Sequence, residues 1–148
     1  MLNSTISTNG SVTLDGTNNN TGSGAGVKFA SGSGITAATY SVTGTKLGTA
    51  ANGYGVWFTG TSNLTSSGTS LINGVSNAAT GAFTAGLMFD DSTTVTLDAG
   101  VGSLIAKGSN AAFQTGVRIA SNGNNSTLVT TKGTVTLGSN DSTSTGFV

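Results

Sequence analysis

A short apolar motif recurs along the chain at a nearly constant spacing. A glycine is followed by three residues of which the first and third are apolar, as in Gly55-Val56-Trp57-Phe58. The motif glycines are Gly26, Gly55, Gly86, Gly116 and Gly146, so successive copies are separated by 29, 31, 30 and 30 residues. A steady period near 30 residues indicates a repeat architecture in which each repeat stacks on the next.

Each period contains three short apolar segments, which predict three β-strands. The first strand is the motif itself, and side-chain alternation turns its first and third residues inward. The second strand begins about nine residues later, and its equivalent leading residues are predicted to be Ile6, Ile35, Leu64, Val95 and Leu128. A glycine precedes the third strand. In the second period these positions are assigned to Gly44 and Leu47, with Gly48 closing the strand.

Glycine, asparagine and the absence of proline fit this picture. Gly-x-Asn segments such as Gly16-Thr17-Asn18 and Gly108-Ser109-Asn110 are expected to form the turn after the third strand, because Gly and Asn tolerate left-handed backbone geometry. Stacked Asn side chains can also hydrogen-bond from coil to coil. The chain has no proline, as expected where each interior strand needs its N–H for pairing. We therefore expect essentially no helix.

The sequence predicts one domain over residues 1–148, an all-β parallel β-helix of about five coils with three short strands in each. The chain starts and stops within a coil. If the end of one copy is followed by the start of another, Gly146-Phe147-Val148-Met1 forms a further copy of the motif. Met1 would then take the inward position that Phe29 holds in its own coil. Two explanations stay open. The chain is a segment of a longer array, or copies stack head to tail through Met1, Leu2, Phe147 and Val148.

Several segments resemble the repeats of filamentous haemagglutinin-type exoproteins and related autotransporter passengers. The clearest are Leu64-Thr65-Ser66-Ser67-Gly68, Gly133-Thr134-Val135-Thr136-Leu137 and Ser11-Val12-Thr13-Leu14. The resemblance implies a right-handed β-helix, the hand also favoured for parallel crossovers. It implies secretion to the bacterial cell surface and a structural or adhesive role in an extracellular fibre. The expected partners are adjoining repeats or further copies of the chain, and host or matrix glycans.

Composition removes several function classes. Five basic and five acidic residues give a net charge of zero without any Lys/Arg run, so nucleic acid is not an expected partner. The chain has no His and no Cys, which removes the commonest general base, the commonest metal ligand and any disulfide. No apolar run approaches the roughly 18 residues of a membrane span, so no membrane insertion is expected. No cofactor or metal is predicted.

The acidic residues give little support for catalysis. They are Asp15, Asp90, Asp91, Asp98 and Asp141, without any Glu. Asp90 and Asp91 are the only adjacent pair, and in a strand they would point to opposite faces. We therefore expect solvated turn carboxylates and no enzyme. The alternative is a glycan-binding or glycan-processing β-helix of the phage-tailspike or polysaccharide-lyase type, which a cluster of carboxylates within about 5–10 Å would support.

One outward ladder is a candidate contact face. The second position after each motif glycine holds Lys28, Trp57, Met88 and Arg118 in successive coils. Stacking in register would place them about 4.8 Å apart, with Lys28 on one side of the Trp57 ring and Met88 on the other. If these side chains are exposed, we expect the ladder to contact a glycan or a neighbouring filament. The alternative is a surface ladder whose members satisfy one another.

Overall fold

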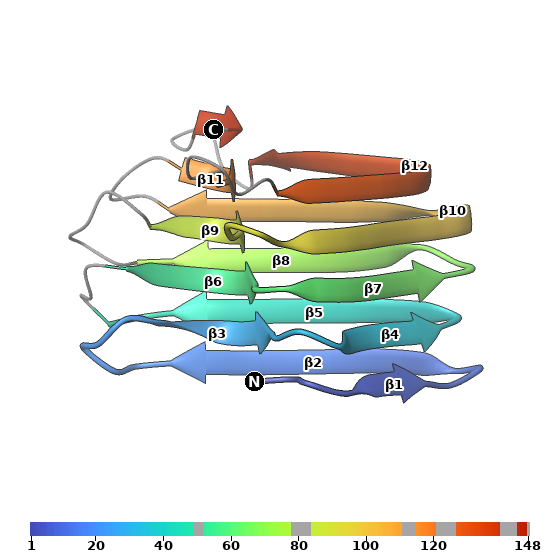
Figure 1. Ribbon diagram of the computed structural model, residues 1–148, viewed down its shortest axis with the longest axis horizontal. Coiled ribbons are helices and arrows are strands. Elements are labelled where there is room, and N and C mark those ends of the chain that lie inside the picture. The colour runs from blue at the N-terminus through green and yellow to red at the C-terminus, as the bar shows by residue number, and fades with distance from the viewer. Residues whose placement is uncertain (49–51, 78–83, 111–114, 121–126, 140–144, 148) are drawn as a thin grey trace.

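The chain winds as a parallel β-solenoid of about four turns (Figure 1). The computed structural model describes residues 1–48, 52–77, 84–110, 115–120, 127–139 and 145–147, and these ranges contain strands and turns but no helix. The predicted fold class is confirmed. The predicted number of coils was slightly too high, because the fifth coil was assembled from two partial coils that lie at opposite ends of the solenoid.

Three faces form the wall of the solenoid, and every described strand pair is parallel. The first face contains β3 (Gly24–Phe29), β6 (Gly53–Phe58), β9 (Ala85–Phe89), β11 (Thr115–Ile119) and β13 (Thr145–Phe147). The second face contains β1 (Thr5–Ser7), β4 (Ser33–Ala37), β7 (Thr61–Ser66) and the first parts of β10 (Thr94–Asn110) and β12 (Leu128–Ser139). The third face contains β2 (Ser11–Asn18), β5 (Thr39–Lys46), β8 (Ser70–Ser76) and the second parts of β10 and β12.

The long strands β10 and β12 depart from the predicted pattern of three short strands per coil. Each continues from the second face to the third, so that the two faces become one sheet. Gly100 and Gly133 lie at this corner with φ of 55° and 72°. Glycine adopts this left-handed geometry at little cost, so the backbone turns the corner within a single extended strand.

Inward side chains stack into apolar ladders that fill the large lobe of the interior. On the first face, Phe29, Phe58 and Phe89 are fully buried and lie in register, as predicted. Their ring centroids are 4.7 and 5.1 Å apart and the planes are almost parallel. This spacing matches the distance of about 4.8 Å between neighbouring strands, so the backbone register itself sets the stacking.

The predicted register of the second strand was wrong in the last two coils. Leu64 pairs with Leu97, whereas Val95 pairs with Ser62. A shift of two residues keeps both side chains inward, so alternation alone cannot detect it. Leu128 pairs with Thr94 and is 56% exposed, because a shift of one residue turns it outward and gives the inward place to Val129.

The third strand of the second coil was also misplaced. Leu47 follows β5 and is 48% exposed, while Tyr40 and Val42 supply the inward residues. The corner before this strand is made by Ala38, which hydrogen-bonds to Gly10 of the coil below and Gly68 of the coil above. Without a glycine at this corner, the next glycine along the chain, Gly44, was assigned to it.

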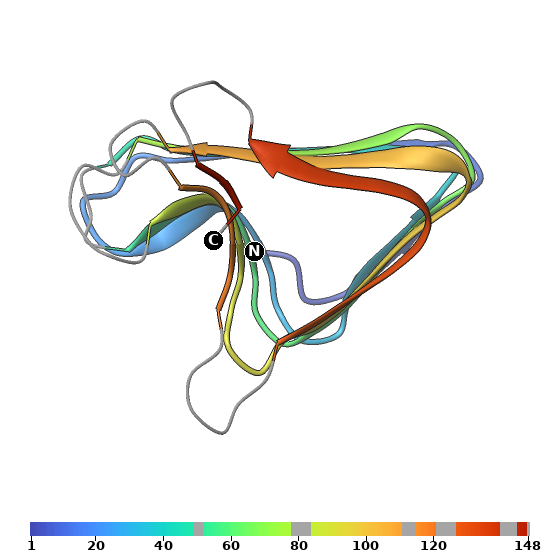
Figure 2. The same cartoon turned by 90° about the horizontal axis from the view of Figure 1, so that it is seen from above.

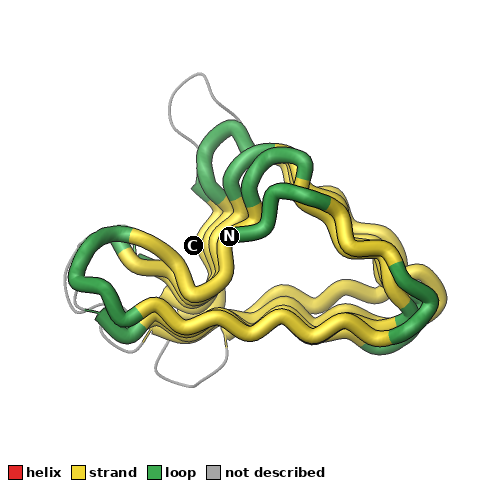
Figure 3. Tube along the Cα trace, turned by 90° about the horizontal axis from the view of Figure 1, so that it is seen from below, coloured by secondary structure: helices red, strands yellow, loops and turns green. Residues whose placement is uncertain are grey.

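Glycines pair across a constriction of the interior, which we call the waist. A Cβ atom built on a third-face glycine of the waist would lie under 3.0 Å from the carbonyl oxygen of a first-face glycine, a distance that Cβ atoms essentially never show. The pairs are Gly16 with Gly26, Gly44 with Gly55, Gly74 with Gly86, and Gly108 with Gly116. The repeat motif therefore begins on glycine because two backbones touch there, and the waist separates the large lobe from a small one (Figures 2 and 3).

Candidate functional site

The predicted outward ladder lies on first-face strands that bend at the waist, and we call the angle inside this bend the notch (Figure 3). Beyond the waist the first-face strands bend away from the third face (Figure 3). Tyr54 precedes the waist glycine and Trp57 follows it, yet their rings are only 5.0 Å apart because both face into this angle. Tyr54, Ala85 and Met88 are buried there, with Ala25, Trp57 and Ala120 packed against them.

The register of the ladder is confirmed. Lys28 pairs with Trp57, Trp57 with Met88, and Met88 with Arg118. The Nζ atom of Lys28 lies 3.9 Å from the centre of the Trp57 ring, a favourable cation–π distance. The expected exposure was wrong for Met88, which is only 2% exposed because it lies inside the notch.

Asp90 completes the surroundings of Trp57. The indole Nε1–H of Trp57 donates to Oδ2 of Asp90 over 3.0 Å. Burial, and after it the Asp90 carboxylate, raise the pKa of Tyr54, while Arg118 acts in the opposite direction. Both the ring and the N–H of Trp57 are therefore engaged within the chain. This geometry supports a ladder whose members satisfy one another more strongly than it supports an open platform for a ligand.

Replacing Trp57 with Phe tests this interpretation. The variant keeps a ring beneath Lys28 but leaves the Asp90 carboxylate without its donor, so we expect a loss of about 1–2 kcal/mol in the free energy of unfolding. Urea denaturation followed by circular dichroism measures it. Asp90→Asn keeps an acceptor and should cost less. An unchanged stability of Trp57→Phe would show that the notch does not depend on this hydrogen bond.

The small lobe holds a polar ladder, of which the sequence interpretation placed three members, Asn18, Ser76 and Asn110, in turns. Asn18, Lys46, Ser76 and Asn110 lie in register at the ends of β2, β5, β8 and β10. Lys46 is fully buried, and its Nζ donates to Oδ1 of Asn18 over 3.3 Å and to the backbone oxygen of Asn20. Each member follows a waist glycine by two residues, which is the signal that could have placed it in a strand.

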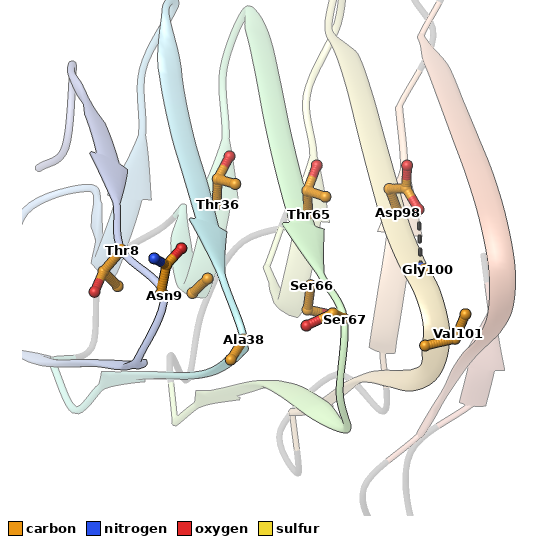
Figure 4. A pocket seen from close by; sticks show the side chains of 11 residues that line it. Thr8, Asn9, Thr36, Ala38, Thr65, Ser66, Ser67, Asp98, Gly100 and Val101 are labelled. Atoms are coloured by element: carbon orange, nitrogen blue, oxygen red, sulfur yellow. Dashed lines mark hydrogen bonds between the residues drawn. The ribbon is translucent and has the colours of Figure 1, made fainter.

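A shallow groove follows the corner between the second and third faces (Figure 4). Its volume is about 640 Å³, and short side chains such as Thr36, Thr65 and Ser67 line it. Asp98 is its only charged residue; Oδ1 accepts a hydrogen bond from the Gly100 N–H over 2.9 Å, and Oδ2 lies 3.7 Å from Nζ of Lys132. Hydroxyls with one paired carboxylate do not make an acid/base pair.

The other described carboxylates do not form a cluster that could hold a metal ion. Asp90 and Asp91 follow β9 in a turn and not in a strand as assumed, and the Asp91 N–H donates to Oδ1 of Asp90. Among the described residues, no three His, Cys, Asp or Glu side chains lie close enough to hold a metal ion. Asp141 lies outside the described residues. Within these ranges there is also no helix long and apolar enough to cross a membrane.

The structure describes three of the four terminal residues that were predicted to form contacts between copies, namely Met1, Leu2 and Phe147. Leu2, not Met1, lies beside Phe29: it forms a parallel bridge with Phe29 and exchanges backbone hydrogen bonds with Lys28 and Ala30. Met1 is 83% exposed, so its predicted inward position was wrong by one residue. Phe147 pairs with Val117, as the repeat motif predicts, and Val148 lies outside the described residues.

The architecture defines the chain as a β-solenoid. Comparisons with protein-family models, with curated proteins and with solved structures found no match.

Proposed function

We propose that the chain is a structural module of a bacterial cell-surface or extracellular fibre, in which its coils stack on further coils. The observation that carries this proposal is that two inward columns of the third face run from β2 to β12 and present apolar side chains at both edges of the described solenoid. The extracellular setting and an adhesive role for the fibre rest on the resemblance of the repeats to secreted bacterial adhesins.

The first coil is left open on one side. Among the described strands, β2 pairs only with β5, and β3 only with β6. Leu14 is half-buried, whereas Val42, its neighbour in the next coil, is fully buried. A hollow of about 380 Å³ lies between Leu2, Leu14 and Val27. An edge with unpaired backbone groups and apolar side chains favours the addition of another strand.

The opposite edge presents matching residues. Val135 and Leu137 of β12 are only partly buried, and they continue the inward columns that begin with Val12 and Leu14. A coil added at either edge would therefore meet aliphatic side chains in register. This coil is supplied by adjoining repeats or by a second copy of the chain. In a second copy, Met1 would be one extra residue at the joint, since Leu2 holds the place beside Phe29.

Electron microscopy of the purified 148-residue chain, with light scattering over a concentration series, separates these two sources. If copies add to one another, we expect unbranched filaments a few nanometres wide that lengthen with concentration. Leu137→Lys, which puts a charge on the exposed core edge, should abolish them, because an unpaired charge would be buried at each joint. Thr36→Lys on an outward position is the matched control. A wild-type chain that stays monomeric would show that copies do not stack, which leaves adjoining repeats.

A further inference from the structure

The third face is a flat sheet whose outer surface no described segment covers (Figures 2 and 3). Its strands stay in register over the stack of β2, β5, β8, β10 and β12. Outward positions along it carry mainly Ser, Thr and Asn, with the apolar side chains of Leu71 and Ile105 side by side near its centre. Ile105 is 42% exposed.

Two opposite charges occupy one outward column of this face. Asp15, Thr43, Asn73 and Lys107 follow one another across β2, β5, β8 and β10. Asp15 and Lys107 are thus about 14 Å apart, three strand spacings. They are the only charged outward residues on the described third face, and neither forms an ion pair with another described residue.

We propose that a second copy of this chain docks face to face on the third face, with its coils running in the opposite direction. A two-fold axis along the strands, between Thr43 and Asn73, places Asp15 of each copy against Lys107 of the other. Leu71 of both copies then lies near the axis, and Ile105 of each copy faces Thr13 of the other. A two-fold axis along the solenoid keeps each coil level with its equivalent. It therefore never brings Asp15 of one copy to Lys107 of the other. The antiparallel arrangement is favoured because it pairs these opposite charges.

The size of the face is sufficient for such a pair. The axis between β5 and β8 brings four strands of each copy, β2, β5, β8 and β10, against those of the other. Four strands of about eight residues give roughly 26 by 19 Å, which is about 500 Å² on each copy. The total of about 1,000 Å² lies at the lower limit of specific interfaces, so we expect a weak dimer. The contact is isologous and closes at two copies, in contrast to end-to-end stacking, which continues without limit.

A charge swap tests the arrangement. Asp15→Lys places like charges at both contacts, and so does Lys107→Asp, so each variant alone should dimerise at least about tenfold more weakly than the wild type. An equimolar mixture of the two variants should dimerise again, because every contact in the mixed pair joins opposite charges. The double variant Asp15→Lys/Lys107→Asp should also recover. Sedimentation velocity at low salt, from micromolar to millimolar concentrations, measures these dissociation constants.

Controls keep this result separate from other association. Thr36→Lys and Thr36→Asp change the charge of the second face and should dimerise as the wild type does. Carbodiimide cross-linking of the wild type should join Asp15 to Lys107 between copies, which mass spectrometry identifies. A monomeric wild type, single variants that dimerise normally, or a mixture that does not recover would each overturn the proposal. End-to-end stacking would appear as species larger than a dimer that the Lys107→Asp change does not weaken.

Discussion

Gly74→Ala is expected to unfold or severely destabilise the solenoid, although it adds a single methyl group. The new Cβ would lie within 3.0 Å of the carbonyl of Gly86, and both groups belong to backbones held in parallel ladders. Neither can move without breaking strand pairing, so the cost should exceed the usual 1–3 kcal/mol of an overpacked core. With a total stability of about 5–15 kcal/mol, a loss of this size lowers the melting temperature by roughly 10 °C or more.

Gly22→Ala is the matched control for this prediction. Gly22 is exposed, and a Cβ built on it meets nothing within 4 Å. The control should change the free energy of unfolding by less than about 1 kcal/mol, in the stabilising direction if anything, since alanine restricts the unfolded chain. Thermal denaturation followed by circular dichroism compares the two variants. Equal melting temperatures for Gly74→Ala and the wild type would mean that the backbones do not touch at the waist.

The fold could be predicted because the same sequence pattern occurs in every coil of a solenoid. The spacing of the motif and the alternation within Gly55-Val56-Trp57-Phe58 recur in each coil, so both the parallel stacking and the inward Phe58 follow from them. The role of Gly55 does not follow. A pattern shows that glycine is required, but only the structure shows that another backbone is the reason.

Errors arose where a coil departs from the average repeat. The second coil turns its corner on Ala38, which gives no turn signal, so the strand that follows was assigned six residues too late, after Gly44. In the fourth coil, Val95 and Leu97 are both inward, and no rule of alternation decides which one aligns with Leu64. Register is a property of two strands together, whereas the sequence displays each strand alone.

The ladder of outward residues in the notch was predicted from the sequence, whereas the bend that forms the notch was not. The contact of Lys28 with the Trp57 ring follows from register, since both residues hold the same place in successive coils. Asp90 was treated as a solvated turn residue, yet it lies one place beyond Phe89, diagonally across from Trp57 in the coil below. The burial of Met88 depends on the bend at the waist, and this bend has no signal in the spacing of apolar residues.

Phe58→Ala is expected to be the most damaging substitution of a single core side chain. Phe58 is fully buried between Phe29 and Phe89, with centroid distances of 4.7 and 5.1 Å. Truncating a buried Phe costs about 3–5 kcal/mol through lost burial and the cavity that remains. The loss of two stacked contacts adds roughly 0.5–1.5 kcal/mol each. In a stack where each coil contacts only its neighbours, a gap in the middle coil weakens the interfaces on both sides.

Phe29→Ala separates stacking from burial, because Phe29 is equally buried but stacks on one ring only. It should cost about 0.5–1.5 kcal/mol less than Phe58→Ala. Val101→Ala, at a side chain that is 95% exposed, should have almost no effect. Urea denaturation monitored by circular dichroism gives all three values under one condition. Equal costs at Phe29 and Phe58 would show that the aromatic ladder stabilises the solenoid by burial alone, and that its stacked geometry is a consequence of strand register.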